Sequence, residues 1–109
     1  MNVFFDAQQA TLWVTGRVDA SNASELDQAL RALEAQVDGP ITVDLSEATY
    51  ISSSGLRYLL LSHRRQSSKQ GMGEGPVLHL RHVPPRILRV LQIAGLDHIL
   101  SVIPAACEE

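Results

Sequence analysis

The fold of this chain is decided by the segment Val43-Asp44-Leu45-Ser46-Glu47-Ala48-Thr49-Tyr50-Ile51-Ser52-Ser53-Ser54-Gly55-Leu56-Arg57. Its first part continues an alternation of apolar and polar residues that begins at Ile41, and this period of two is typical of a β-strand. The spacing of Leu56, Leu59, Leu60 and His63 is helical. The segment therefore predicts a strand over 41–45, a short turn, and a helix that begins near Ser54.

Three consecutive serines, Ser52, Ser53 and Ser54, stand where this helix begins. A serine hydroxyl at a helix N-terminus can accept a hydrogen bond from one of the free backbone N–H groups there. The same N–H groups and the positive end of the helix dipole also favour a phosphate. The pattern is compatible with helix capping alone, or with a phosphorylation switch on serines that also cap.

The chain before this segment predicts a hairpin and a helix. Two strands over 3–7 and 11–16 are joined by a tight turn at residues 8–10. Capping-box spacing in Asn22-Ala23-Ser24-Glu25 and an apolar stripe that reaches Val37 indicate the helix. Asp38-Gly39-Pro40 is expected to end it, with the glycine as a left-handed cap.

The chain after the serines continues the alternation of helices and strands. The expected elements are a helix over 54–69, a glycine-rich surface loop over 70–76, a strand over 77–80, a helix over 85–94 and a short edge strand or final turn over 99–103. Pro84-Pro85 begins the last helix and Gly95 ends it. Its buried side is expected to consist of Ile87, Leu88, Leu91 and Ala94.

Strands that alternate with helices predict one α/β domain with a mixed sheet of four to five strands and helices packed on it. The sheet is expected to be parallel in its middle and antiparallel at the first hairpin. Functional groups gather beyond the C-terminal ends of parallel strands. This topology therefore places Asp19 near the turn formed by residues 52–54.

Composition restricts the partners of the protein. The chain has 109 residues, enough for one hydrophobic core, and its formal net charge of −3 argues against direct nucleic-acid binding. A small basic cluster, Arg64, Arg65 and Lys69, lies at a helix end, where cations complement the helix dipole. The sequence has no basic N-terminal segment before an apolar run, and no stretch of the roughly 20 apolar residues needed to cross a bilayer. We therefore expect a cytoplasmic protein without membrane insertion. The lone Cys107 suits a reducing compartment, and no cofactor is indicated.

Two possible catalytic or metal sites are weakly supported. A hydrolase would need a base close to Ser53, but His63 lies two or three helical turns beyond it and no Gly-x-Ser-x-Gly elbow is present. Asp19 would be the acid of such a catalytic triad, but only its residue type suggests this role. His79 and His82 stand where a strand ends, with no cysteine or carboxylate cluster beside them in the sequence, so we predict no metal site.

The segment Asp44-Leu45-Ser46, followed by Tyr50-Ile51-Ser52-Ser53-Ser54-Gly55-Leu56, resembles the signature of STAS domains, the family of bacterial anti-sigma factor antagonists. Gly16-Arg17-Val18-Asp19 is similar to the glycine and aspartate that follow the second strand of that family. Val90-Leu91-Gln92-Ile93-Ala94-Gly95-Leu96 is similar to its last long helix and the following turn. The resemblance implies a STAS domain over residues 1–104 and a C-terminal tail over 105–109.

The resemblance also implies a site on the serine-rich turn. By position, Ser53 is the serine that a partner kinase phosphorylates, with Ser54 and Ser52 as second choices. Ser52 stands where the family has an aspartate. Three alternatives therefore stay open: phosphorylation of Ser53, phosphorylation of a neighbouring serine, or no phosphorylation. The implied partner-binding residues are Asp19, Ser52, Ser53, Ser54, Gly55, Leu56 and Arg57.

The implied function is that of a non-enzymatic anti-sigma factor antagonist. Its unphosphorylated form would bind an anti-sigma factor that is also a serine kinase, freeing a sigma factor for transcription, and serine phosphorylation would switch it off. ATP would belong to the kinase, and a PP2C-type phosphatase would be a further partner. Two alternatives stay open: a STAS subunit that braces the ATPase of a phospholipid-trafficking ABC transporter, and an antagonist of some other signalling protein.

Overall fold

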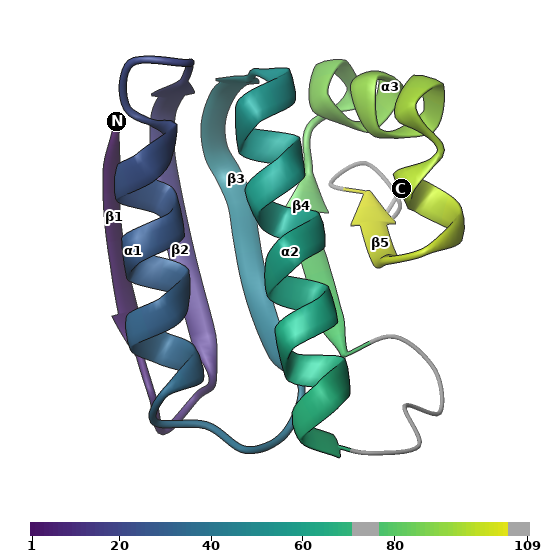
Figure 1. Ribbon diagram of the computed structural model, residues 1–109. Coiled ribbons are helices and arrows are strands. Elements are labelled where there is room, and N and C mark those ends of the chain that lie inside the picture. The colour runs from purple at the N-terminus through teal and green to yellow at the C-terminus, as the bar shows by residue number, and fades with distance from the viewer. Residues whose placement is uncertain (71–76, 105–109) are drawn as a thin grey trace.

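The computed structural model describes residues 1–70 and 77–104. These residues form five strands, three α-helices and one 3₁₀-helix (Figure 1). In chain order the elements are β1 (Asn2–Asp6), β2 (Thr11–Val18), α1 (Ala23–Glu34), β3 (Ile41–Ile51), α2 (Ser53–Gln70), β4 (Leu78–Val83), α3 (Pro85–Ala94), η1 (Leu96–His98) and β5 (Ser101–Pro104). The predicted α/β fold is confirmed.

The sheet has the strand order β1-β2-β3-β4-β5. β1 and β2 pair antiparallel, as predicted for the first hairpin, and the three following pairs are parallel. Parallel neighbours need a crossover connection, and the segments that contain α1, α2 and α3 provide one each. Figure 1 shows α1 and α2 side by side across one face of the sheet, with α3 beside the upper part of α2 in this view. For residues 99–103 the sequence predicted either an edge strand or a final turn, and the structure has an edge strand there, β5.

The hydrophobic core lies between the sheet and the helices. It includes Leu12, Val14, Leu26, Leu30, Leu33, Ile41, Val43, Leu45, Leu56, Leu59, Leu78, Leu80, Ile87 and Leu91, all buried. Burying one such side chain contributes roughly 1.5–3 kcal/mol. Since Leu56 and Leu59 are among them, the core holds the first turns of α2 in place against the sheet.

β3 is longer than predicted. The sequence predicted a strand over 41–45 and then a turn, but the strand continues to Ile51 and α2 begins two residues later. The pairing with β2 shifts register twice, between Trp13 and Thr15 and between Gly16 and Arg17, so β3 carries extra residues opposite β2. Each bulge breaks the period of two, which is why residues 46–50 do not alternate like a strand.

α1 is shorter than predicted, and its ends are built differently. It ends at Glu34, with Ala35 in a right-handed conformation as its C-cap. Among the described glycines, a positive φ occurs at Gly16 and Gly95, so the predicted left-handed cap at Gly39 is wrong. Instead, the amide Nε2 of Gln66 donates hydrogen bonds to the carbonyls of Val37 and Gly39, at 3.1 and 2.8 Å.

The predicted capping box of α1 is also wrong. Asn22 occupies the N-cap position, but its side chain makes no capping hydrogen bond. Its Oδ1 accepts from the backbone N–H of Asp19 at 2.9 Å, and its Nδ2 donates to the carbonyl of Arg17 at 3.0 Å. The side chain therefore fixes the connection between β2 and α1, which carries Asp19.

The last helix follows the sequence closely. Pro84 is the N-cap of α3, Pro85 its first residue, and Gly95 its left-handed C-cap with φ 78°. Ile87 and Leu91 are buried and Leu88 is half-buried, but Ala94 is exposed, so its predicted burial is wrong. Residues 71–76 of the predicted glycine-rich loop and the tail 105–109 lie outside the described residues. Within the described ranges, no helix is long and apolar enough to cross a membrane.

Candidate functional site

β2 and β3 end at the same point of the sheet. Val18 pairs with Ile51, and the backbone N–H of Ser52 donates to the carbonyl of Val18 at 2.9 Å. Asp19 and Ser52 are the first residues after this pair. The structure thus brings Asp19 and the serine-rich turn together at the C-terminal ends of β2 and β3.

The three serines differ in exposure and bonding. Ser52 is half-buried and its hydroxyl accepts a hydrogen bond from the N–H of Gly55 at 3.3 Å, so Ser52 caps α2. Ser53 is the first residue of α2 and is exposed, whereas Ser54 is half-buried. Because Ser52 provides the cap, the hydroxyl of Ser53 is not required for the helix start.

Gly55 lets the first turn of α2 lie directly on the sheet. A Cβ at this position would lie 2.8 Å from Cγ1 of Ile51 and 2.9 Å from Cγ1 of Val18. Gly55 and Leu56 are both buried. Among the predicted partner-binding residues, these two therefore determine where the exposed ones stand.

The carboxylate of Asp19 is held by its neighbours. Its Oδ1 accepts from the hydroxyl and the backbone N–H of Ser21, at 2.6 and 3.0 Å, and its Oδ2 lies 3.5 Å from Nε of Arg17. The hydrogen bond from the Ser21 hydroxyl is the main cause that lowers the pKa of Asp19, and Arg17 adds to it. These contacts keep the Asp19 carboxylate charged and hold it in one orientation beside the serine-rich turn.

Arg17 and Tyr50 lie beside Asp19 and the serine-rich turn, and no role was predicted for either side chain. The guanidinium of Arg17 lies over the Tyr50 ring, 4.1 Å from its centroid. Tyr50 is 37% exposed. The alternation of polar and apolar residues in β2 marks Arg17 as a surface residue, but its contact with Tyr50 depends on the bulges that set the register.

A shallow hollow of about 220 Å³ lies on the first turns of α2. It is lined by Ser53, Ser54, Arg57 and Tyr58. Arg57 is exposed and stands four residues after Ser53, on the same side of the helix. The predicted phosphorylation site and an arginine therefore border the same depression.

The residues considered for catalysis or metal binding are placed differently. His63 lies ten residues after Ser53 on α2, almost three helical turns away. Burial lowers the pKa of His63, and the charge of Arg64 adds to the effect. His82 contacts the buried Asp44, with its Nδ1 3.1 Å from Oδ2. Within residues 1–70 and 77–104, no group of three His, Cys, Asp or Glu side chains could hold a metal ion.

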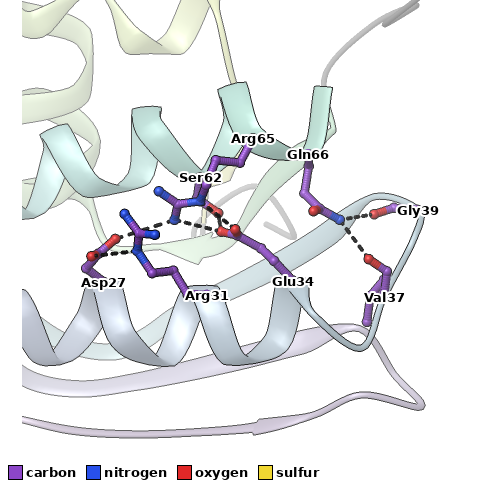
Figure 2. A network of polar contacts seen from close by, with 8 residues as sticks. All are labelled: Asp27, Arg31, Glu34, Val37, Gly39, Ser62, Arg65 and Gln66. Carbon is purple, nitrogen blue, oxygen red and sulfur yellow. Dashed lines mark hydrogen bonds and ion pairs between the residues drawn. The ribbon is translucent and has the colours of Figure 1, made fainter. Parts of the chain in front are cut away.

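The basic cluster predicted at the end of α2 has a more specific role. Arg65 bridges the two parallel helices: its Nε donates to Glu34 at 2.6 Å and its Nη2 lies 3.4 Å from Asp27 (Figure 2). The hydroxyl of Ser62 donates to Glu34 as well. The bond to Glu34 is the main cause that raises the pKa of Arg65. These contacts join α1 to α2 below the site.

The chain has clear similarity to known proteins. The family model described as Mlab, STAS domain matches residues 1–103. The protein named anti-sigma factor antagonist BtrV from Bordetella bronchiseptica is 33% identical over 91 residues, which are 84% of this chain and 72% of that protein. A solved anti-sigma factor antagonist from Mycobacterium paratuberculosis has a TM-score of 0.71 at 25% identity, covering 90% of this chain and 79% of that one.

A chain of the Acinetobacter MlaFEDB complex, in its ATP-bound form, is equally similar. It has a TM-score of 0.71 at 25% identity, covering 94% of this chain and 99% of that chain. The single α/β domain, with its five-stranded mixed sheet and three α-helices, thus matches the fold of these relatives. The chain belongs to the STAS-domain family of the anti-sigma factor antagonists, which the sequence signature had indicated.

Proposed function

We propose that this protein is an anti-sigma factor antagonist whose unphosphorylated form binds an anti-sigma factor with serine kinase activity, and that phosphorylation of Ser53 ends this binding. The position of Ser53 carries the proposal: an exposed hydroxyl on the first residue of α2, at the edge where β2 and β3 end. The relatives named as antagonists support the class of partner.

A phosphate on Ser53 would leave the fold intact. The side chain is exposed, and Ser52 retains the capping hydrogen bond. The phosphate adds about −1.5 to −2 charges at pH 7, at the positive end of the helix dipole, which tolerates them. The inhibitory effect must therefore act on the complex with the partner.

In the complex, the same phosphate would be covered. Taking a charge out of water costs several kcal/mol per ion unless the partner compensates it. A complex of micromolar affinity has a total binding free energy of about −8.2 kcal/mol. Phosphorylation of a covered serine can therefore release such a complex.

The other proposed contact residues surround Ser53. Asp19, Ser52, Ser54 and Arg57 would contact the partner, while the buried Gly55 and Leu56 position them. In this role the protein performs no catalysis: ATP is bound by the kinase, and a PP2C-type phosphatase would restore the unmodified serine.

The test compares three variants by isothermal titration calorimetry with the purified anti-sigma factor kinases of the source organism. Ser53→Asp is expected to weaken binding at least about 10-fold, which corresponds to 1.4 kcal/mol, and Ser53→Ala to retain it. Ser68→Asp is the matched control, because Ser68 is exposed on the same helix and about 22 Å further along it. Equal affinities of Ser53→Asp and Ser53→Ala would refute the switch.

Two observations favour a second function. The matching family model is described as Mlab, and the matched chain of the MlaFEDB complex is covered almost completely. The protein would then be a non-enzymatic STAS subunit of a phospholipid-trafficking ABC transporter. Calorimetry with the transporter ATPase in place of the kinase distinguishes the two: a binding partner found there, and none among the kinases, would favour the transporter.

A further inference from the structure

Positive charge is concentrated in two helices of this acidic protein. The chain has a formal net charge of −3, yet α2 and α3 contain no aspartate or glutamate. Their basic residues are Arg57, Arg64, Arg65, Lys69, Arg86 and Arg89. The next carboxylate after α3 is Asp97 in η1, 3.8 Å from Nε2 of His98.

Ion pairing divides the arginines into two groups. Those with a carboxylate partner are Arg17 with Asp19, Arg31 with Asp27, Arg65 with Glu34 and Arg81 with Asp44. The remaining four, Arg57, Arg64, Arg86 and Arg89, are exposed, and no ion pair joins them to any carboxylate of the described chain. All four belong to α2 and α3, so the unpaired charge is localised on these helices.

The four unpaired arginines lie on the outer sides of α2 and α3. Arg57 and Arg64 are seven residues apart, two helical turns, on the side of α2 that carries Ser53. Arg86 and Arg89 are three residues apart on α3, whose opposite side is buried through Ile87 and Leu91. α2 and α3 both contact β3, and Figure 1 shows them next to one another. We call these four arginines the cationic face.

We infer that the cationic face binds an acidic surface of the protein partner. The inference rests on the proposed function and specifies the chemistry of the partner's side. Charge complementarity selects an acidic surface, because four guanidinium groups without internal partners gain most from external carboxylates. Arg57 also makes the face continuous with Ser53, since the two residues line the same hollow.

Other polyanionic partners fit less well. A nucleic acid would be repelled by the net negative charge of the whole chain. A membrane-surface helix needs an apolar side that enters the lipid, but the apolar side of α3 belongs to the core. Ile93, 80% exposed on the outer side of α3, is a single apolar residue and suits a protein contact.

The cationic face gives the phosphorylation of Ser53 a second physical effect. A phosphate one helical turn before Arg57 would place up to two negative charges on this face. It would then neutralise part of the charge that attracts the partner, in addition to the cost of burying the phosphate.

The experiment measures calorimetric affinity for the anti-sigma factor kinase at low and high salt. Each neutralised cation, as in Arg89→Gln, is expected to weaken binding about 2- to 5-fold at low salt, the effect of an exposed pair. Arg86→Gln combined with Arg89→Gln should weaken it roughly 4- to 25-fold, and high salt should reduce the difference. Arg31→Gln is the matched control, since it removes the same charge from an exposed arginine of α1.

The variants separate this inference from the phosphorylation switch. If the double variant binds like the wild type while Ser53→Asp does not bind, the switch stands and the cationic face is refuted. If the double variant is weakened while Ser53→Asp is not, the face stands and the switch fails.

A second measurement decides the case in which no kinase binds. The ¹⁵N-labelled protein is titrated with a polyglutamate peptide, phosphatidylglycerol vesicles or duplex DNA, and amide shifts are followed. Shifts in α2 and α3 with the peptide, lost in the double variant, support the inference. Absent shifts, or tighter binding to vesicles or DNA, overturn it.

Discussion

Gly55→Ala tests whether close contact with the sheet, more than helix propensity, determines the start of α2. In an open helix, replacing glycine by alanine stabilises by up to about 1 kcal/mol. Here the new Cβ would lie 2.8 Å from Cγ1 of Ile51 and 2.9 Å from Cγ1 of Val18. Real Cβ atoms essentially never approach other atoms so closely, so the helix or the two side chains must move.

The structure predicts that the clash is larger than the propensity gain. Val18 and Ile51 are 0% and 3% exposed, and β-branched side chains have little rotamer freedom with which to yield. Overpacking a core by one methyl group costs roughly 1–3 kcal/mol. Two simultaneous contacts place Gly55→Ala in the upper part of that range. After subtraction of the propensity gain, we expect a net loss of about 1–2 kcal/mol.

Urea unfolding followed by circular dichroism measures this loss. A second variant, Val18→Ala, removes one of the two clashing atoms, so the effects of Gly55→Ala and Val18→Ala should not add: the double variant should be more stable than their sum predicts. A more stable Gly55→Ala protein would refute the reasoning, because the propensity gain would then exceed any clash. Strictly additive losses would show that the clash with Val18 does not occur.

Three further predictions concern stability. Leu59→Ala should cost about 2–5 kcal/mol in urea unfolding because Leu59 is fully buried, and Leu60→Ala clearly less because Leu60 is half-buried; equal losses would contradict the orientation of α2. Arg65→Met should lower the free energy of thermal unfolding by about 1–3 kcal/mol, since it removes the guanidinium that donates to the buried Glu34, and adding Glu34→Leu should recover much of the loss; no recovery would contradict the bridge. Burial raises the pKa of Asp44, but hydrogen bonds from Ser46, His82 and Arg81 outweigh this effect, so the pKa is lowered on folding. The ionised Asp44 therefore stabilises the folded protein at a pH above its unfolded pKa. This stabilisation is lost as the pH falls through its folded pKa. In Asp44→Asn, the free energy of unfolding in urea should therefore fall less steeply with pH below about pH 4 than in the wild type. The same pH dependence in both proteins would contradict this role of Asp44.

The elements that the sequence predicts well are those governed by local chemistry. Pro84, Pro85 and Gly95 set the two ends of α3 through backbone restrictions that hold in any context. The apolar stripe of Leu26, Leu30 and Leu33 likewise predicts the buried side of α1. The missed features depend on distant residues. The end of β3 follows from bulges opposite β2, and the region after α1 is completed by Gln66 of α2, far away in sequence.

The candidate site divides in the same way. The proximity of Asp19 to the serines could be predicted, because it follows from the parallel pairing of β2 and β3. The different exposure of Ser52 and Ser53 could not, because it depends on which residue ends the strand and which begins the helix. The stacking of Arg17 on Tyr50 and the pairing of Arg65 with Glu34 also arise only when separate elements pack.

The substitution of the family aspartate by Ser52 concerns the charge of the site more than its shape. Serine and aspartate are both good N-cap residues, and Ser52 caps α2 here. An aspartate would place a carboxylate beside the phosphate of Ser53, and two like charges about 5 Å apart repel by roughly 1 kcal/mol even in water. The first turn of α2 contains no acidic residue in this chain, and the carboxylate of Asp19 lies next to Arg17. Loss of the aspartate therefore removes an obstacle to holding a phosphate and leaves Ser53, the proposed acceptor, in place, so the effect of the proposed phosphorylation would act almost entirely on the complex.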